Sequence, residues 1–360
     1  MTVTETPPVT DEPVVVVVPR RTVPGGVSAG LRWVVALGGA AVIFGAFVLA
    51  KGADPLQAFS SMFAALRTDT SLTGIATQSA PLILAALAVA VPAKAGLVNV
   101  GGEGQLLLGG IGATAMSLGL GGSLPGGVTL VLICLAGALA GAAWSALAGV
   151  LRLKVGINEA VTTLLLNYIA LDLMLFLIYD KWKDANGSGQ PVTAPLPVPE
   201  RLPLLGTSGL HAGVLIAIVA TGAVWWTLRS TRWGFQLRVV GGNPEAARRA
   251  GLKVGLLLIS AMAVGGALAG LGGVVQLAGA EFKLRPGFLV SYGYIAFLAS
   301  WLARHHPVRV ATAAVLLAAI AVSGDSLQLD SGLPAATVNV LMALVLLAVF
   351  GWTQHKKVAA

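Results

Sequence analysis

A glycine-rich segment, residues 96–105 (GLVNVGGEGQ), separates two apolar runs and carries three polar side chains: Asn99, Glu103 and Gln105. Amides and a carboxylate at membrane depth can hydrogen-bond a polar solute. Backbone this rich in glycine is tolerated there only where it is buried in protein or faces water. Two interpretations follow. The segment is a broken or re-entrant element beside a solute path, or it is an ordinary inner turn in which Glu103 faces the dipole of the next helix.

A second polar group recurs at i, i+4 and i+8 within an apolar run, and consists of Glu159, Thr163 and Asn167. This spacing places the three side chains on one face of a helix, directed toward the interior of a helical bundle. They are predicted to line a translocation path together with the first group. The alternative is structural: Asn158 caps the helix, Glu159 complements its dipole, and Asn167 joins neighbouring helices by hydrogen bonds.

Other chemistry has no support in the sequence. The chain contains no Gly-x-x-x-x-Gly-Lys-Ser/Thr phosphate loop, no His-Glu-x-x-His motif and no Gly-x-Ser-x-Gly elbow. Its four histidines are scattered, and its single cysteine, Cys134, lies in an apolar run. We predict no catalytic residue, no metal site and no cofactor bound by this chain.

A cationic segment, residues 229–253, lies between two long apolar runs and carries six Lys or Arg against one acid. Its centre has the signals of a short helix, with Asn243 as N-cap, Pro244 at the first helical position, Glu245 in the first turn and Arg248 toward the end. Cationic segments beside membrane spans remain in the cytoplasm. We therefore expect a cytoplasmic loop, 229–255, whose short helix contacts another protein.

The composition requires a membrane. Of the 360 residues, 56% are hydrophobic and 11% are charged, whereas a soluble protein carries about a quarter of its residues as charges. The fold class is therefore an all-α polytopic membrane protein in contact with lipid. The net charge of +8 arises from cations at the ends of apolar runs, which indicates topology and not nucleic-acid binding.

About ten transmembrane helices are predicted, with eight or nine also possible. The apolar windows are 33–50, 72–93, 104–120, 127–150, 157–179, 210–228, 256–279, 288–303, 308–324 and 334–352. With the N-terminus inside, sixteen of the 23 Lys and Arg fall in the cytoplasm. The positive-inside rule thus predicts cytoplasmic N- and C-termini and an even number of spans.

The predicted organisation is a single transmembrane domain, 31–353, between a disordered cytoplasmic tail, 1–30, and a short cytoplasmic tail, 354–360. A Pro-rich stretch, 180–209, is expected to be an external loop. Pro81–Ile111 and Leu256–Ser300 share a pattern of apolar helix, Gly-containing loop and second apolar helix. Because they would enter from opposite sides, we predict an inverted repeat, which is common among transporters. Small residues within the spans, such as Gly137, Gly141 and Gly270, predict close helix packing.

Three blocks in order resemble one family: residues 96–105, 157–170 (INEAVTTLLLNYIA) and 234–251 (GFQLRVVGGNPEAARRAG). Together they are similar to the permease subunits of bacterial ATP-binding-cassette (ABC) importers, in the nucleoside and simple-sugar branch related to ribose and branched-chain amino-acid permeases. The resemblance covers residues from about 70 to 350. It implies a plasma-membrane permease that forms the path for a small polar solute, with a nucleoside favoured, by alternating access.

The resemblance also implies partners. A separate ATPase would bind ATP and Mg²⁺, a second permease subunit would complete a heterodimer, and an extracytoplasmic lipoprotein would deliver the solute. The segment 241–251 matches the family's coupling helix, which docks on the ATPase. The residues implied as ATPase contacts are Arg238, Gly241, Asn243, Pro244, Glu245, Ala246, Ala247, Arg248, Arg249 and Gly251.

Two alternatives remain open at this point. An ion-coupled secondary transporter acting alone would also show inverted repeats and buried acids, and it would transport without an ATPase. Within the ABC class, a sugar or a branched-chain amino acid would suit the polar groups nearly as well as a nucleoside.

Overall fold

A computed structural model describes residues 29–120, 122–185, 187, 189–334, 337–345 and 347. Every regular element that it names in these ranges is a helix, as the apolar windows predict. The α-helices are α1 (Ala29–Ala50), α2 (Pro55–Ala65), α3 (Asp69–Ala93), α4 (Gly102–Leu120), α5 (Gly126–Val155), α6 (Glu159–Phe176), α7 (Gly213–Ser230), α8 (Arg232–Gly242), α9 (Pro244–Arg249), α10 (Val254–Gln276), α11 (Tyr292–Leu302) and α12 (Pro307–Ser331).

Six of these helices are long and apolar enough to cross a membrane: α3, α5, α6, α7, α10 and α12. Helices α6 and α10 continue through π-helical turns, at Leu177–Lys181 and Leu277–Glu281. A pair of helices, α1 and α2, bent by 117° at the break between them, would add a seventh if it counts as one span. The count of ten is therefore not confirmed. The window 288–303 yields only the eleven-residue α11, and the window 334–352 lies partly outside the described residues.

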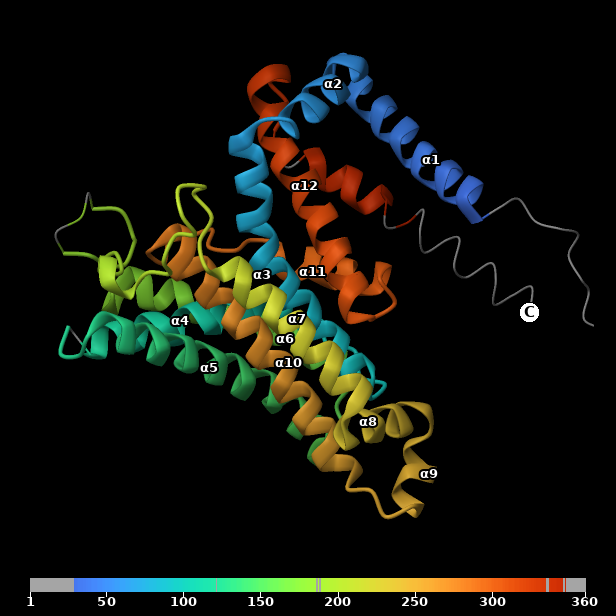
Figure 1. Cartoon of the computed structure of the whole chain (residues 1–360), viewed down its shortest axis with the longest axis vertical. Coiled ribbons are helices and arrows are strands. Elements are labelled where there is room, and N and C mark those ends of the chain that lie inside the picture. Colours follow the sequence, from blue (N-terminus) through green and yellow to red (C-terminus); the bar gives the residue numbers. More distant parts are fainter. Residues whose placement is uncertain are drawn as a thin grey trace, which may run out of the picture.

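The predicted tails, 1–30 and 354–360, also lie outside the described residues, except that Ala29 and Gly30 begin α1. Helix α3 runs through the middle of the bundle (Figure 1) and is buried almost continuously from Ser79 to Pro92. Hydrophobicity alone does not explain this position, because α5 is at least as apolar yet far less buried, and lipid can also cover an apolar face.

Glycines bring α4, α5 and α10 into backbone contact. A Cβ on Gly109 of α4 would lie 2.0 Å from the carbonyl oxygen of Gly270 in α10, and a Cβ on Gly141 of α5 would lie 2.3 Å from that of Gly266. Only glycine allows this approach. The prediction that small residues serve close packing is confirmed here, because close van der Waals contact replaces the hydrophobic effect between helices in lipid.

Two connections interrupt the bundle. The first, Lys94–Gly101, joins α3 to α4, and the second, Phe282–Ser291, joins α10 to α11. The helices that follow them begin side by side, since a Cβ on Gly102 would lie 3.3 Å from the Cα of Gly293. The two connections thus bring the N-termini of α4 and α11 together inside the bundle.

The ends of the bundle differ. Helices α8 and α9 lie at one end, and the irregular stretch 182–212 lies at the other (Figure 1). That stretch contains a 3₁₀ turn, Val198–Glu200, and two isolated β-bridges. It is fastened to the end of α10 and to the second connection by backbone hydrogen bonds from Leu196 to Phe282 and from Leu202 to Ala278.

Candidate functional site

One face of α6 holds the first connection. The backbone N–H of Val98 donates to Glu159 Oε1 (3.0 Å), and that of Val100 donates to Thr163 Oγ1 (3.1 Å). Asn167 then accepts from Gly104 N–H at Oδ1 (2.8 Å) and donates from Nδ2 to the Val100 carbonyl oxygen (3.0 Å). The i, i+4, i+8 spacing therefore matches successive backbone groups of an irregular segment that has few bonds of its own.

Asn99 and Gln105 complete this support from within the segment. Their amides pair reciprocally, with Asn99 Nδ2 to Gln105 Oε1 at 3.1 Å and Gln105 Nε2 to Asn99 Oδ1 at 2.9 Å. Asn99 also donates to the carbonyl oxygen of Ala88 and accepts from Gly101 N–H. Both side chains are fully buried. The pair satisfies amide groups that would be costly if left unbonded at this depth.

Glu103 bridges the two broken elements. It lies in the first turn of α4, yet its carboxylate accepts from the backbone N–H groups of Ser291 (2.6 Å) and Gly293 (2.7 Å) at the start of α11. An anion at a helix N-terminus is stabilised by the unpaired N–H groups and the helix dipole. The turn interpretation anticipated such a role toward α4 itself, whereas the carboxylate caps the neighbouring helix instead.

The structure thus gathers all six residues of the predicted path around one connection, with their side chains bonded to protein groups. Five of them, all except Glu103, are buried. Glu159 also forms an ion pair with Arg152 near the end of α5. Asn158 caps α6, as the structural interpretation expects, by accepting from Ala160 N–H at 2.8 Å. Direct contact of these residues with a solute stays a prediction; their positioning of the connection is observed.

The cationic segment folds as its signals predict. The side chain of Asn243 accepts from the N–H groups of Glu245 and Ala246, both at 3.0 Å, and Pro244 occupies the first position of α9. Glu245 pairs with Arg248 (2.6 Å) and with Arg249 (3.3 Å), and all three side chains are exposed. Ala247 is buried beneath them. Gly251 ends the element with φ of 82°, a conformation that favours glycine.

Helix α8, which is part of the cationic segment, contacts the first connection. A Cβ on Gly241 would lie 2.3 Å from the carbonyl oxygen of Lys94, so the two backbones touch. Arg238, in the same helix, donates to the carbonyl oxygen of Leu228 at the end of α7. Burial, and the nearby Arg238 guanidinium, lower the pKa of the Lys94 ammonium. A displacement of α8 would therefore act directly on the residue where the first connection begins.

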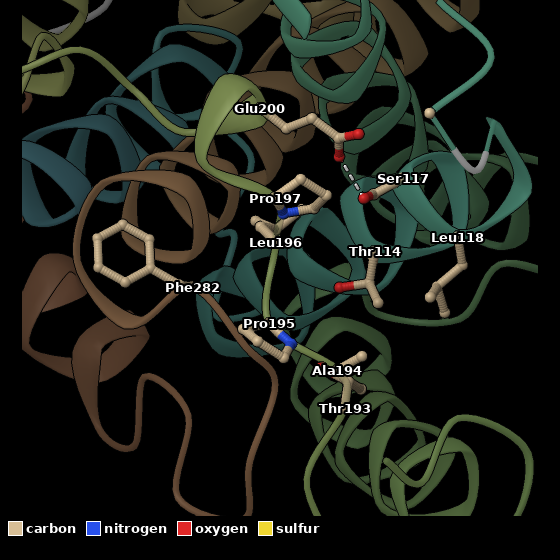
Figure 2. A pocket seen from close by; sticks show the side chains of 11 residues that line it. Thr114, Ser117, Leu118, Thr193, Ala194, Pro195, Leu196, Pro197, Glu200 and Phe282 are labelled. Atoms are coloured by element: carbon tan, nitrogen blue, oxygen red, sulfur yellow. Dashed lines mark hydrogen bonds between the residues drawn. The ribbon is translucent and has the colours of Figure 1, made fainter. Parts of the chain in front are cut away.

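A small cavity of about 200 Å³ lies at the opposite end, between α4 and the stretch 193–200 (Figure 2). The Ser117 hydroxyl donates to the buried carboxylate of Glu200 across it. Thr193 anchors the same stretch to the second connection, since it accepts from Leu284 N–H at 3.0 Å. The irregular stretch is thus fixed over α4 by specific polar contacts.

One polar surface escaped the sequence analysis. Thr70, Thr73, Thr77 and Gln78 lie along one face of α3 and line a cavity with the end of α10. Their spacing of i, i+3, i+7 and i+8 is a helical repeat that could have been recognised. These residues carry no charge, and three of the four lie within the apolar window 72–93, so the window was interpreted as a plain span.

Comparison with known proteins relates this chain to transport components. The family described as branched-chain amino acid transport system, permease component, matches residues 71–350. The chain is 36% identical over 342 residues to the glucose ABC transporter permease protein TsgB13 of Haloferax volcanii, covering 91% of this chain and 89% of that protein. It is 30% identical to the guanosine permease protein NupP of Bacillus subtilis over 275 residues, 76% of this chain and 78% of NupP. It is also 30% identical to the nucleoside permease protein NupB of Lactococcus lactis over 325 residues, 85% and 88% of the two chains.

Proposed function

Because this chain belongs to the family of branched-chain amino acid transport system permease components, we propose that it carries nucleosides across the plasma membrane as one half of an importer. It is an ABC permease subunit, a multi-pass membrane protein, and not itself an enzyme. The family implies an ATPase and a substrate-binding partner. In this proposal the ATPase binds ATP and Mg²⁺, and a related permease forms the other half of the path.

The geometry of α9 is the observation that carries the assignment of a coupling helix. A six-residue helix with an exposed acid and two exposed arginines stands at one end of the bundle, capped by Asn243 and anchored through buried Ala247. A short helix closed by its own caps can fit a cleft in another protein without unfolding. We assign the exposed residues that the sequence predicts, with Ala247 as their buried anchor, as the ATPase-docking surface: Arg238, Gly241, Asn243, Pro244, Glu245, Ala246, Arg248, Arg249 and Gly251.

The contact between Gly241 and Lys94 supports a mechanism of alternating access. When ATP closes the ATPase dimer, α8 and α9 move together, and α8 presses on the start of the first connection. The α6 side chains carry that connection and α4 as one unit, and Glu103 transmits the movement to α11. The free energy enters as different affinities of the ATPase for the inward-open and outward-open states.

Nucleosides are the proposed solute because permeases for guanosine and for nucleosides are among the relatives. Glucose is a second candidate, since the similarity to the Haloferax glucose permease extends over 91% of this chain. Both solutes are neutral and rich in hydroxyl groups, in agreement with amides and hydroxyls along the predicted path. An ion-coupled transporter would require no docking helix.

Charge reversal on α9 tests the assignment. We expect Arg248→Glu in the assembled complex to reduce co-purification of the ATPase and to abolish uptake of tritiated uridine. Lys181→Glu, an equally exposed cation at the other end of the bundle, should leave both unchanged.

A double variant separates docking from helix stability. Glu245→Arg combined with Arg248→Glu keeps an ion pair within α9 but reverses the charges presented to the ATPase. If this exchange restores uptake, the pair only stabilises the helix. If uptake is lost while the ATPase co-purifies and hydrolysis stays coupled, the docking assignment is wrong.

A further inference from the structure

A cavity of about 540 Å³ lies between the first turns of α3, the end of α10 and the second connection. Its size is within the range of roughly 300–1,000 Å³ that small-molecule sites occupy. It is separate from the six residues of the predicted path. The lining is mixed, and its polar side chains include Thr70, Thr77, Gln78, Gln276, Glu281 and Arg285.

Gln276 gives this cavity a specific chemistry. Its side-chain Nε2 donates to Glu281 Oε1 at 3.4 Å, while its Oε1 has no hydrogen-bond partner among the described residues. The residue is only 8% exposed. Reversing the amide would set its oxygen against the carboxylate, so the oxygen remains the unpaired group. A buried acceptor without a partner is costly unless a ligand donates to it.

The charges of the lining favour a neutral ligand. Glu281 is paired with Arg285, whose Nε lies 2.7 Å from Glu281 Oε2. The acid is therefore neutralised by a residue of the same lining. Gln276 and Glu281 are five residues apart in sequence, at the two ends of the π-helical turn Leu277–Glu281, and their side chains meet there. Such turns are frequent at functional sites.

We propose that this cavity binds the hydroxyl groups of a neutral solute, the vicinal diol of a ribose or a hexose, before it passes between the permease subunits. Gln276 Oε1 accepts a hydrogen bond from one hydroxyl, and Thr77 and Gln78 on α3 contact the other. This inference rests on the proposed function, and it adds the subsite and the chemical group that the subsite selects.

Thiol labelling tests the site in the assembled complex, in a Cys134→Ala background. A Thr77→Cys variant should react with a membrane-impermeant methanethiosulfonate from the side of the binding protein. Uridine at about four times its dissociation constant should slow that reaction about fivefold, because the protection factor is one plus the ratio of the uridine concentration to the dissociation constant. The analogue 2′,3′-dideoxyuridine lacks the diol and should not. A Leu118→Cys control in the neighbouring cavity should react equally with and without uridine.

Transport by two matched variants provides the second test. Gln276→Leu removes the unpartnered acceptor and should lower uridine uptake about tenfold without lowering the unfolding temperature. Thr114→Val removes another unpartnered buried oxygen outside this cavity and should change uptake less than twofold.

The outcomes separate the subsite from the importer. If the wild-type complex imports uridine but Gln276→Leu does so equally well, and uridine does not protect the thiol of the Thr77→Cys variant, the subsite is wrong and the importer stands. If the wild type imports neither uridine nor glucose, the proposed solute is wrong. In that case the labelling result decides the subsite by itself. Protection of the Thr77→Cys thiol by uridine supports the subsite, and no protection overturns it.

Discussion

The two connections that interrupt the bundle are built in opposite ways. The first, Lys94–Gly101, is fixed by side chains of α6 and by its own buried amide pair. The second, Phe282–Ser291, contains three residues other than glycine with positive φ: Phe282 at 60°, Leu289 at 54° and Ser291 at 68°. Several of its residues are exposed. The backbone of the first connection is held by hydrogen bonds to buried side chains, whereas the backbone of the second is strained.

This difference indicates which element moves. Backbone in the left-handed region costs side chains other than glycine about 1–2 kcal/mol per residue, and such strain collects at switching elements. Helix α11 has it on both sides, because Arg304 and His305 also adopt positive φ, at 51° and 56°. We infer that α11 can move relative to the unit formed by α4, α6 and the first connection, with Glu103 as the contact between them.

The largest expected effect lies where the two helices meet. In Gly293→Ala the added Cβ would lie 2.0 Å from the backbone nitrogen of Glu103, so α11 must separate from α4. We expect a loss of about 3 kcal/mol in the free energy of unfolding and no uptake. Gly119→Ala, in the same helix as Glu103 but with open space around it, should not destabilise the chain. Equal unfolding temperatures of the two variants in detergent would contradict this view of the contact.

The next effect compares the fastening of the two connections. Asn167→Leu leaves the Val100 carbonyl unpaired in the first connection and Gly104 N–H unpaired in the first turn of α4. Its expected cost is about 2 kcal/mol, because buried backbone groups lose their partners. Thr193→Val leaves only Leu284 N–H unpaired in the second, at about 1 kcal/mol. Chemical denaturation of both variants measures the two losses in the free energy of unfolding. A larger loss for Thr193→Val would show that the second connection is the more strongly fastened one.

A smaller pair of changes should have opposite signs. Gly96, in the first connection, has φ of 78°, and Gly96→Ala should cost about 1 kcal/mol through strain. Ser291→Gly relieves strain in the second connection and should stabilise the chain by about 0.5 kcal/mol. If the strain serves motion, the Ser291→Gly complex transports more slowly although it is more stable. If both variants are less stable than the wild type, backbone strain does not distinguish the second connection from the first.

The effect that is smallest near neutral pH is the titration of His305. Burial, and then the charge of Lys94, lower the pKa of His305 from 6.5 to about 4, and its Nδ1 lies 3.0 Å from Ser300 Oγ. In the unfolded chain this imidazole takes up a proton near pH 6.5, whereas in the folded chain it stays neutral down to about pH 4. Stability should therefore fall as the pH drops from 6.5 to 4 and be constant above. Thermal unfolding of the wild type against His305→Gln measures this pH dependence, which the variant should lack.

The sequence predicted local structure well where one helix determines it. Asn243, Pro244 and Glu245 occupy the predicted cap and first turn of α9, and the polar residues of α6 share the predicted face. What that face contacts could not be predicted, because the partner is an irregular segment about sixty residues away. The span count failed for a related reason. An apolar window such as 288–303 records hydrophobicity, but not the positive φ at Leu289 and Ser291 that precedes the short α11.

The contact of Gly102 with Gly293 also constrains how this protein can vary. A side chain introduced at either position cannot be accommodated by shrinking the residue opposite, since that residue is already glycine. In a genetic selection, compensating substitutions should therefore not arise at the partner position. They should arise at distant residues that re-seat a whole helix, and Gly293 should remain glycine in functional descendants that lack such distant changes.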